Sequence, residues 1–203
     1  MKSKRFDRRG FFKQAVKLAA GGVAVPLVGL NNAQASDPRT LIQTPAASLM
    51  TAGARSLSFD HTHTRERISL VHAVDSDYVP DALTSLNRFL RDHYSGTVGR
   101  MDPQLFDLLH QIRLALGAKS LSAYEVISGY RCPDTNDHLR NSRGGGVAKR
   151  SLHMEGKAID VRIPGVPLAE LCDAALSLQA GGVGYYPREQ FVHIDTGRVR
   201  NWG

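Results

Sequence analysis

The chain has 203 residues, with 26 basic and 19 acidic side chains and a formal net charge of +7. Seven of the basic residues and one acidic residue lie in the first 35 positions, which leaves 19 basic and 18 acidic residues for the rest of the chain. A nearly neutral remainder argues against a nucleic-acid-binding protein. A chain of this length is expected to form a single domain.

Residues 1–35 have the pattern of an export signal and are left out of the fold prediction. Residues 7–13 contain an arginine pair that resembles a twin-arginine signal, and a small-x-small motif at 33–35 resembles a cleavage site. The apolar run between them, residues 18–30, is shorter than the ~20 residues needed to span a bilayer. We therefore expect export by the twin-arginine translocase to the periplasm, with no stable membrane span in the mature protein. An uncleaved membrane anchor is the alternative.

The first part of the exported chain is predicted to be a flexible N-terminal segment, which we call the lead, followed by a β-hairpin. Residues 36–54 are rich in Ala, Thr, Ser and Pro and lack a clear period, so the folded domain is expected to span residues 55–203. Residues 56–59 and 67–71 predict two short strands around a polar turn.

Two helices are predicted next. Residues 80–94 place their apolar side chains on one face of a helix. Residues 102–116 give the stronger pattern, with Asp102 as N-cap, Pro103 at the first position and Gly117 as the stop.

The second half of the chain predicts strands that carry the functional motifs. Tyr124–Ser128 reads as a strand that leads into a turn. Residues 134–150 are polar and Gly-rich and predict a loop, either a mobile solvated one or, as we favour, a flap lining the substrate groove. The later elements are a strand at 158–163, a helix at 167–178, and strands at 182–186 and 190–195. This order predicts an α+β fold, with helices packed on a small, mainly antiparallel sheet in a single domain.

Three residues in this half form a candidate metal site. His153, Asp160 and His193 supply two imidazoles and one carboxylate, which suit a catalytic zinc ion whose fourth position binds water. Gly156 interrupts a helical spacing, so we expect His153 on a loop, Asp160 on the next strand and His193 on a second strand. The alternative is that these residues have only structural roles.

The sequence around these residues resembles a known family. Ser-x-His-x-x-Gly-x-Ala-x-Asp at 151–160 resembles the signature of the M15 zinc D,D-peptidases, which include D-alanyl-D-alanine carboxypeptidases and murein endopeptidases. Ile-Ser-Gly-Tyr-Arg at 127–131 looks like a second motif of that family. Residues 181–187 and 191–197 are similar to a branch of cell-wall endopeptidases that carries a twin-arginine signal. The resemblance implies a hedgehog/DD-peptidase-like fold, one Zn²⁺ per chain and peptidoglycan as the substrate.

The second motif suggests which residues contact the substrate. The resemblance implies that Arg131 binds the oxyanion or a substrate carboxylate, and a guanidinium has the fixed bidentate geometry for this. A surface salt bridge is the alternative for Arg131. Ser128 and Tyr130 of the same motif, and Asn136 in the following loop, are expected to bind the substrate peptide.

The general base is where the sequence departs from the family. Several M15 carboxypeptidases have a Glu three residues before the last zinc histidine, and here that position is Gln190, which cannot accept a proton. Asp195 follows that histidine by two positions, so both side chains share a strand face. We predict that Asp195 is the base; the alternative is that it orients a neighbouring side chain. Glu189 is expected to face away, and His138 and Glu155 are weaker candidates.

Two further pairs of residues could bind metal or form a bridge. His61 and His63 share a face of a predicted polar turn without a third ligand nearby in the sequence, so we expect them to be solvated. Cys132 and Cys172 could form a disulfide in the periplasm, but we favour two buried free thiols. Neither cysteine has a C-x-x-C partner, which argues against a separate metal centre.

The combined pattern predicts a zinc-dependent murein endopeptidase that hydrolyses peptide cross-links in periplasmic peptidoglycan. One alternative is a carboxypeptidase that removes a terminal D-alanine, which would need a closed pocket instead of an open groove. Another is a catalytically silent zinc module that only binds the cell wall, which the missing glutamate at position 190 keeps open.

Overall fold

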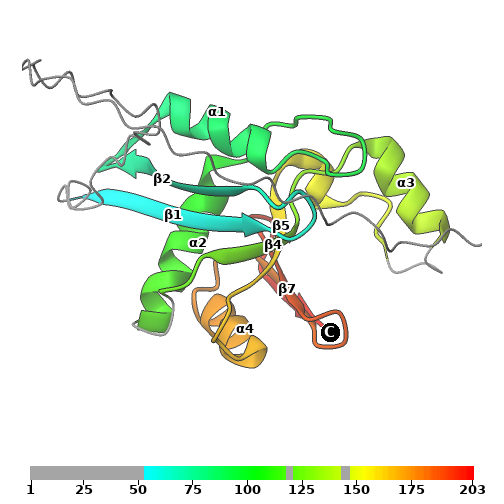
Figure 1. Ribbon diagram of the computed structural model, residues 1–203. Coiled ribbons are helices and arrows are strands. Elements are labelled where there is room, and N and C mark those ends of the chain that lie inside the picture. Colours follow the sequence, from blue (N-terminus) through cyan, green and yellow to red (C-terminus); the bar gives the residue numbers. More distant parts are fainter. Residues whose placement is uncertain (1–52, 118–120, 143–146) are drawn as a thin grey trace, which may run out of the picture. The chain divides into compact units, whose positions relative to one another are not determined.

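The computed structural model describes residues 53–117, 121–142 and 147–203 (Figure 1). The expected export signal and nearly all of the expected lead lie outside the described residues. The described part contains helices and one mixed sheet, so the predicted α+β class is confirmed. No helix in these ranges is long and apolar enough to cross a membrane.

The strands follow the predicted order, with two additions. They are β1 (Ala54–His61), β2 (Arg67–Val74), β3 (Asp77–Tyr78), β4 (Tyr124–Ser128), β5 (Ala158–Arg162), β6 (Gly182–Tyr186), β7 (Phe191–Asp195) and β8 (Arg200–Trp202). The helices are α1 (Pro80–Phe89), α2 (Pro103–Leu116), α3 (Pro133–Ser142) and α4 (Leu168–Ser177), with a 3₁₀ helix, η3 (Leu152–Glu155). The short strands β3 and β8 were not predicted.

All strands join one eight-stranded sheet in the order β3-β2-β1-β4-β5-β7-β6-β8. The pairs β1–β4 and β6–β8 are parallel and the other pairs are antiparallel. The sheet is therefore mainly antiparallel as predicted, but larger than the small sheet we expected, because β3 and β8 extend its two edges.

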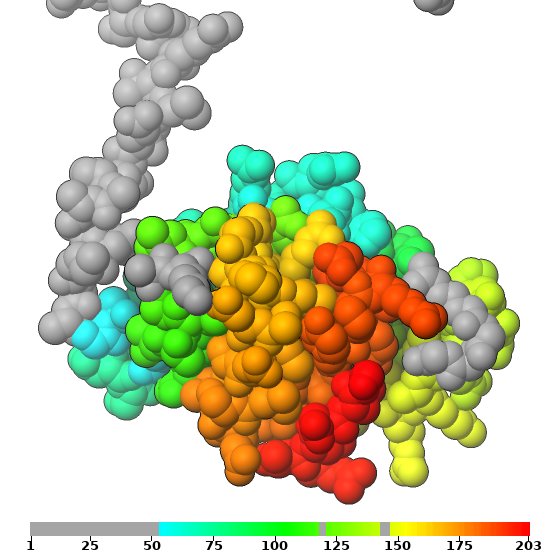
Figure 2. All heavy atoms as spheres, turned by 90° about the horizontal axis from the view of Figure 1, so that it is seen from below, coloured from blue at the N-terminus to red at the C-terminus, as the bar shows by residue number. Residues whose placement is uncertain are grey.

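Helices α1, α2 and α4 and one face of the central strands enclose the hydrophobic core. Helices α2 and α4 pack on each other, α2 also against β1 and α4 against β6 and β7. Figure 2, a view from below, shows α2 and α4 on this surface with the C-terminal residues beside α4. Ile159 and Val161 of β5 and Val192 and Ile194 of β7 are fully buried in the core. Because side chains alternate along a strand, the residues between them project from the opposite face.

Helix α2 begins as predicted and α1 ends earlier than predicted. The Asp102 carboxylate accepts a hydrogen bond from the Gln104 amide at 3.0 Å, and Gly117 ends α2 with φ of +60°. Helix α1 ends at Phe89 instead of residue 94, because the Asp92 carboxylate binds the amides of the following turn.

The predicted loop at 134–150 is wrong for its first part. Helix α3 occupies Pro133–Ser142, and its sequence is so polar that no apolar period marks it. Its inner side buries Thr135, Asn136 and Leu139. Residues 143–146 lie outside the described ranges. The expectation for Cys132 and Cys172 is confirmed, since both are free, buried thiols.

Candidate metal centre and active site

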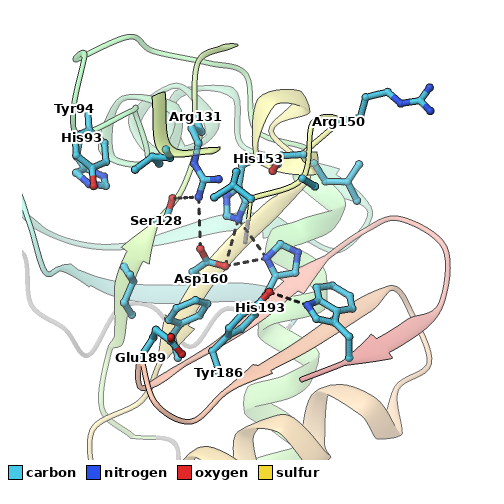
Figure 3. A pocket seen from close by; sticks show the side chains of 18 of the residues that line it. His93, Tyr94, Ser128, Arg131, Arg150, His153, Asp160, Tyr186, Glu189 and His193 are labelled. Atoms are coloured by element: carbon cyan, nitrogen blue, oxygen red, sulfur yellow. Dashed lines mark hydrogen bonds and ion pairs between the residues drawn. The ribbon is translucent and has the colours of Figure 1, made fainter. Parts of the chain in front are cut away.

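His153, Asp160 and His193 come together from three elements, and Figure 3 shows their side chains pointing at one another. The distances are 3.3 Å from His153 Nε2 to Asp160 Oδ1, 2.9 Å from His193 Nδ1 to the same oxygen, and 3.3 Å between the two nitrogens. Two atoms that each lie ~2.05 Å from a tetrahedral ion are ~3.3 Å apart. The spacing of this set, which we call the ligand group, fits a single zinc-sized ion.

A straight row of cross-strand partners holds the ligand group in place. Ser128 of β4 pairs with Asp160 of β5, which pairs with His193 of β7; His193 pairs with Gly184 of β6, and Gly184 pairs with Trp202 of β8. Partners in adjacent strands share one sheet face. The row therefore crosses five strands on the face opposite the core.

Two local features explain why this row and η3 meet. A register shift between Val126 and Ser128 marks a β-bulge, which moves Ser128 from the core side to the side of Asp160. On the other side, Gly156 ends η3 in the left-handed region with φ of +68°. A Cβ at Gly156 would collide with the Arg100 carbonyl oxygen, so the glycine of this motif is required by close packing. His153 thus lies on a 3₁₀ helix, where the sequence predicted a loop.

Neighbouring acceptors decide which nitrogen of each histidine faces the centre. His153 Nδ1 lies 2.7 Å from the Gly129 carbonyl oxygen, to which it donates, and this leaves the lone pair on Nε2. His193 Nε2 lies 3.0 Å from Asp195 Oδ2 and donates to it, which leaves the lone pair on Nδ1. Two nitrogen lone pairs and a carboxylate oxygen then converge, and such a set repels itself unless a cation lies between its members.

The electrostatics of the ligand group agree with a bound cation. Burial opposes ionisation of Asp160, but the charge and hydrogen bond of His153, followed by the hydrogen bond of His193, hold its pKa well below the usual value. Burial likewise lowers the pKa of His193, yet hydrogen bonds to Asp160 and Asp195 outweigh it and raise this pKa to about 9. The site therefore favours positive charge at the point where the three ligand atoms meet.

Asp195 is fully buried, and both of its oxygens are engaged. Oδ1 accepts from the amides of Gly182 and Gly197 at 3.1 and 2.8 Å, and Arg200 donates to both oxygens at 3.1 and 2.7 Å. Arg200 reaches across Gly182, where a Cβ would collide with the Asp195 carboxylate. This environment favours the alternative role for Asp195, which is to orient His193, over the predicted role as base.

Arg131 lies beside the ligand group. Its Nη2 is 3.3 Å from Ser128 Oγ and 3.9 Å from Asp160 Oδ2, and its Nη1 is 3.5 Å from Asn136 Oδ1. Asn136 is fully buried and also donates to the Ala148 carbonyl. Asn136 thus contacts Arg131 and is not among the residues that line the cavity, and its predicted contact with substrate stays a prediction.

The ligand group lies in a cavity of about 800 Å³. Of the residues predicted to bind substrate, Ser128 lines this cavity, whereas the Tyr130 ring packs over Gly99 and lies outside it. Several lining residues were missed by sequence reasoning: His93, Tyr94, Phe191, Arg200 and Trp202. The single tryptophan of the chain was the one signal that could have drawn attention to the C-terminal segment.

Glu189 also lines the cavity, and the prediction that it faces away was wrong. Gln190 adopts a positive φ of +61°, its side-chain Nε2 donates to the Pro187 carbonyl, and β7 begins only at Phe191. Glu189 therefore lies in a turn and not in a regular strand. Among the described residues that line the cavity, it is the one carboxylate besides Asp160.

A second set of histidines, which we call the rim group, lies beside the same cavity, and two of its members, His63 and His93, line it. His63 and His93 stack in parallel with ring centroids 4.1 Å apart, and His61 meets their rings edge-on at 6.1 and 5.6 Å. The solvated environment expected for His61 was wrong, because its side chain is buried. Burial, followed by the neighbouring imidazoles, lowers the pKa of both His61 and His93 to about 4. Within the described ranges, only the ligand group brings metal-binding atoms together.

An α+β domain with two imidazoles, one carboxylate and a nearby guanidinium in one cavity has the layout of hydrolases that use a single metal ion. The family model described as "Peptidoglycan L,D-endopeptidase MepK", among the M15 peptidases, matches residues 49–202. The chain therefore belongs to this family of M15-type peptidases, and the predicted family resemblance is confirmed at that level.

Curated relatives agree with the family match. The chain is 42% identical over 186 residues to the peptidoglycan L,D-endopeptidase MepK of Escherichia coli K12, which covers 91% of this chain and 94% of the relative. It is 40% identical over 185 residues to the protein named "Probable peptidoglycan L,D-endopeptidase MepK" of Haemophilus influenzae, covering 91% and 92% of the two chains. No solved structure matches significantly. These relatives are named L,D-endopeptidases, whereas the sequence motifs suggested D,D-peptidases.

Proposed function

We propose that this protein is a murein endopeptidase that hydrolyses L,D peptide cross-links of peptidoglycan with one zinc ion held by His153, Asp160 and His193. The observation that carries the proposal is the convergence of the three ligand atoms in a cavity large enough for a peptide. The cross-link type follows the names of relatives that are about as long as this chain.

The protein supplies the groups that such a hydrolysis requires. When bound, the zinc ion would polarise the attacking water and the scissile carbonyl. Gly129 and Asp195 fix the rings of His153 and His193, so that the ligand nitrogens stay aimed at one point. Arg131 offers a fixed positive charge to the developing oxyanion or to a substrate carboxylate.

A group is also needed to accept the proton of the attacking water. The hydrogen bonds to both oxygens of Asp195 support its role as the residue that orients His193, which leaves Glu189 as our candidate for proton transfer. His138 and Glu155 do not line the cavity, and Glu155 instead pairs with Lys157 at 2.9 Å.

Digestion of purified murein sacculi tests the function. The mature protein with stoichiometric zinc is expected to release monomers from L,D-cross-linked dimers, measured by chromatography and mass spectrometry of the muropeptides. Shortened stems without cleaved cross-links would instead identify a carboxypeptidase. An unchanged digest would identify a cell-wall-binding module without activity.

We also propose that residues 1–35 direct the protein to the periplasm through the twin-arginine translocase. The support is the arginine pair at positions 8 and 9 and the small-x-small motif that ends at residue 35. Replacing both arginines with lysine should retain the precursor in the cytoplasm, as measured by cell fractionation and intact mass. Normal export of that variant would contradict the assignment.

A further inference from the structure

The mechanism above does not use Trp202, although its indole lies next to the ligand group. Trp202 lies on β8, lines the cavity and is 36% exposed. Its ring centroid is 5.2 Å from that of His193. An aromatic ring this close to a metal ligand, with part of its surface open to the cavity, is in a position to contact substrate.

Gly184 is the reason that the indole reaches His193. In the row across the sheet, Gly184 lies between His193 and Trp202 and has no side chain to separate them. A Cβ at Gly184 would lie 2.6 Å from the indole, closer than van der Waals contact allows. The glycine therefore leaves a space that the indole of the next strand fills.

Two further contacts fix the orientation of the ring. The indole Nε1–H donates to Tyr186 Oη at 2.8 Å, and the Tyr186 ring stacks on Phe191 with centroids 4.6 Å apart. On the other side, the Arg200 guanidinium lies 4.9 Å from the indole centroid while it binds Asp195. Trp202 and Tyr186 thus form a rigid aromatic surface, which we call the indole wall.

The indole wall and Arg131 lie on opposite sides of the ligand group. The row runs from Ser128, which contacts Arg131, through Asp160 and His193 to Trp202. The cavity therefore presents the Arg131 guanidinium on one side of the ligand atoms and aromatic rings on the other, where the Arg200 guanidinium is engaged by Asp195 and the indole. A substrate that extends across the ligand group meets Arg131 with one part and an aromatic surface with the other.

We propose that the indole wall is a substrate subsite that binds the uncharged, aliphatic part of the peptide residue next to the scissile bond. The Trp202 ring centroid lies 5.2 Å from that of His193, which places the wall within about two residues of the reaction centre, because an extended peptide advances only ~3.3–3.6 Å per residue. This inference rests on the proposed endopeptidase function.

Kinetics of Trp202→Ala and Trp202→Phe test the proposal. Burial of one methylene contributes about fourfold to affinity, so loss of contact with two or three should raise KM for a cross-linked muropeptide by roughly 15- to 60-fold. Trp202→Phe keeps an aromatic face and should raise KM by a smaller factor. The zinc content should stay at one ion per chain in both variants. Val199→Ala is the matched control, since Val199 is 59% exposed, precedes β8 and does not line the cavity.

The outcomes separate a substrate contact from a structural support. Unchanged KM with a parallel fall in kcat and zinc affinity would show that Trp202 only supports His193 and would overturn the proposal. Unchanged kinetics in Trp202→Ala would overturn it as well. If wild-type protein cleaves no cross-link at all, the proposed function fails. If wild-type protein is active and Trp202→Ala has unchanged kinetics, only the proposal for the indole wall fails.

Fluorescence gives a test that needs no variant. Trp202 is the only tryptophan of the chain, so its emission reports directly on the indole wall. Titration of the wild-type zinc protein with the peptides released by the reaction should shift or quench this emission, with a midpoint near their inhibition constant. Emission that stays constant while the peptides inhibit the enzyme would contradict contact with the indole.

Discussion

Two groups of three side chains lie in or beside one cavity, and their different surroundings give them different chemistry. The ligand group contains a carboxylate and fixes each imidazole through an acceptor, the Gly129 carbonyl or Asp195. The rim group has three imidazoles and no carboxylate, and His61 Nδ1 itself accepts the His63 amide at 3.2 Å. Proximity of histidines is therefore not sufficient for a metal site. The acceptors behind the rings and a negative charge among them decide whether the group attracts a cation.

The largest expected effect comes from removing one imidazole from each group. His153→Ala should abolish stoichiometric zinc binding and reduce turnover by about 10³-fold or more, because metal activation of water is worth several kcal/mol. His63→Ala, in the rim group, should keep one zinc ion and most of the activity. Metal analysis and muropeptide kinetics on both variants check this. Unchanged zinc content in His153→Ala would remove the basis for the ligand group.

The next largest effects should show whether Asp195 orients His193 or acts as the general base. Asp195→Asn should weaken zinc binding by ~10–100-fold, and excess zinc should restore activity. Glu189→Gln should keep zinc and lose ~10²–10⁴-fold in turnover at saturating zinc. Titration with a zinc chelator and kinetics at saturating zinc measure the two quantities. A deep, zinc-independent loss in Asp195→Asn would return the role of base to Asp195.

A smaller effect is expected in the stability of zinc-free protein above neutral pH. The pKa of His193 is raised to about 9 from an unfolded value near 6.5, so its proton stabilises the fold fully below ~pH 6.5. This contribution, on the order of 3 kcal/mol, is lost as the pH rises through about 9. Urea unfolding of chelator-treated protein at both ends of this range should show the loss. Zinc-loaded protein is the control, because the ion replaces the proton.

The rim group should affect the free energy of unfolding at acid pH, and by a smaller amount than His193 does at alkaline pH. The pKa values of His61 and His93 are lowered to about 4, so their contribution to stability is present above ~pH 6.5 and is lost as the pH falls through about 4. Since His93 is only partly buried, we expect a loss on the order of 1 kcal/mol. His93→Gln should reduce this loss in urea unfolding at pH 4.5 and 6.5. An identical loss in the variant would assign it to other groups.

Sequence alone was sufficient where a local pattern determines the structure. The cap and stop signals of α2 and the spacing of His153 and Asp160 could be read directly, because they depend on neighbours along the chain. Helix α3 could not be predicted, since its polar sequence has no apolar period and it is stabilised by tertiary contacts.

The missed parts of the site depend on residues that are far apart in sequence or on very short elements. His93 joins His61 from a different segment, and no spacing rule connects them. Strand β8 has three residues, too few for an alternation, so the position of Trp202 beside His193 could not be predicted. Glu189 was misplaced because a single positive φ, at Gln190, delays the start of β7.

The direct pairing of Asp160 with His193 has a consequence for folding. If β7 slipped by one residue against β5, His193 would turn to the sheet face opposite Asp160 and the three ligand atoms could not meet. A metal ion that bridges them binds only the native pairing and adds its binding free energy to that arrangement. Metal binding would therefore favour molecules in which β5 and β7 have paired in the native register over molecules in which they have not.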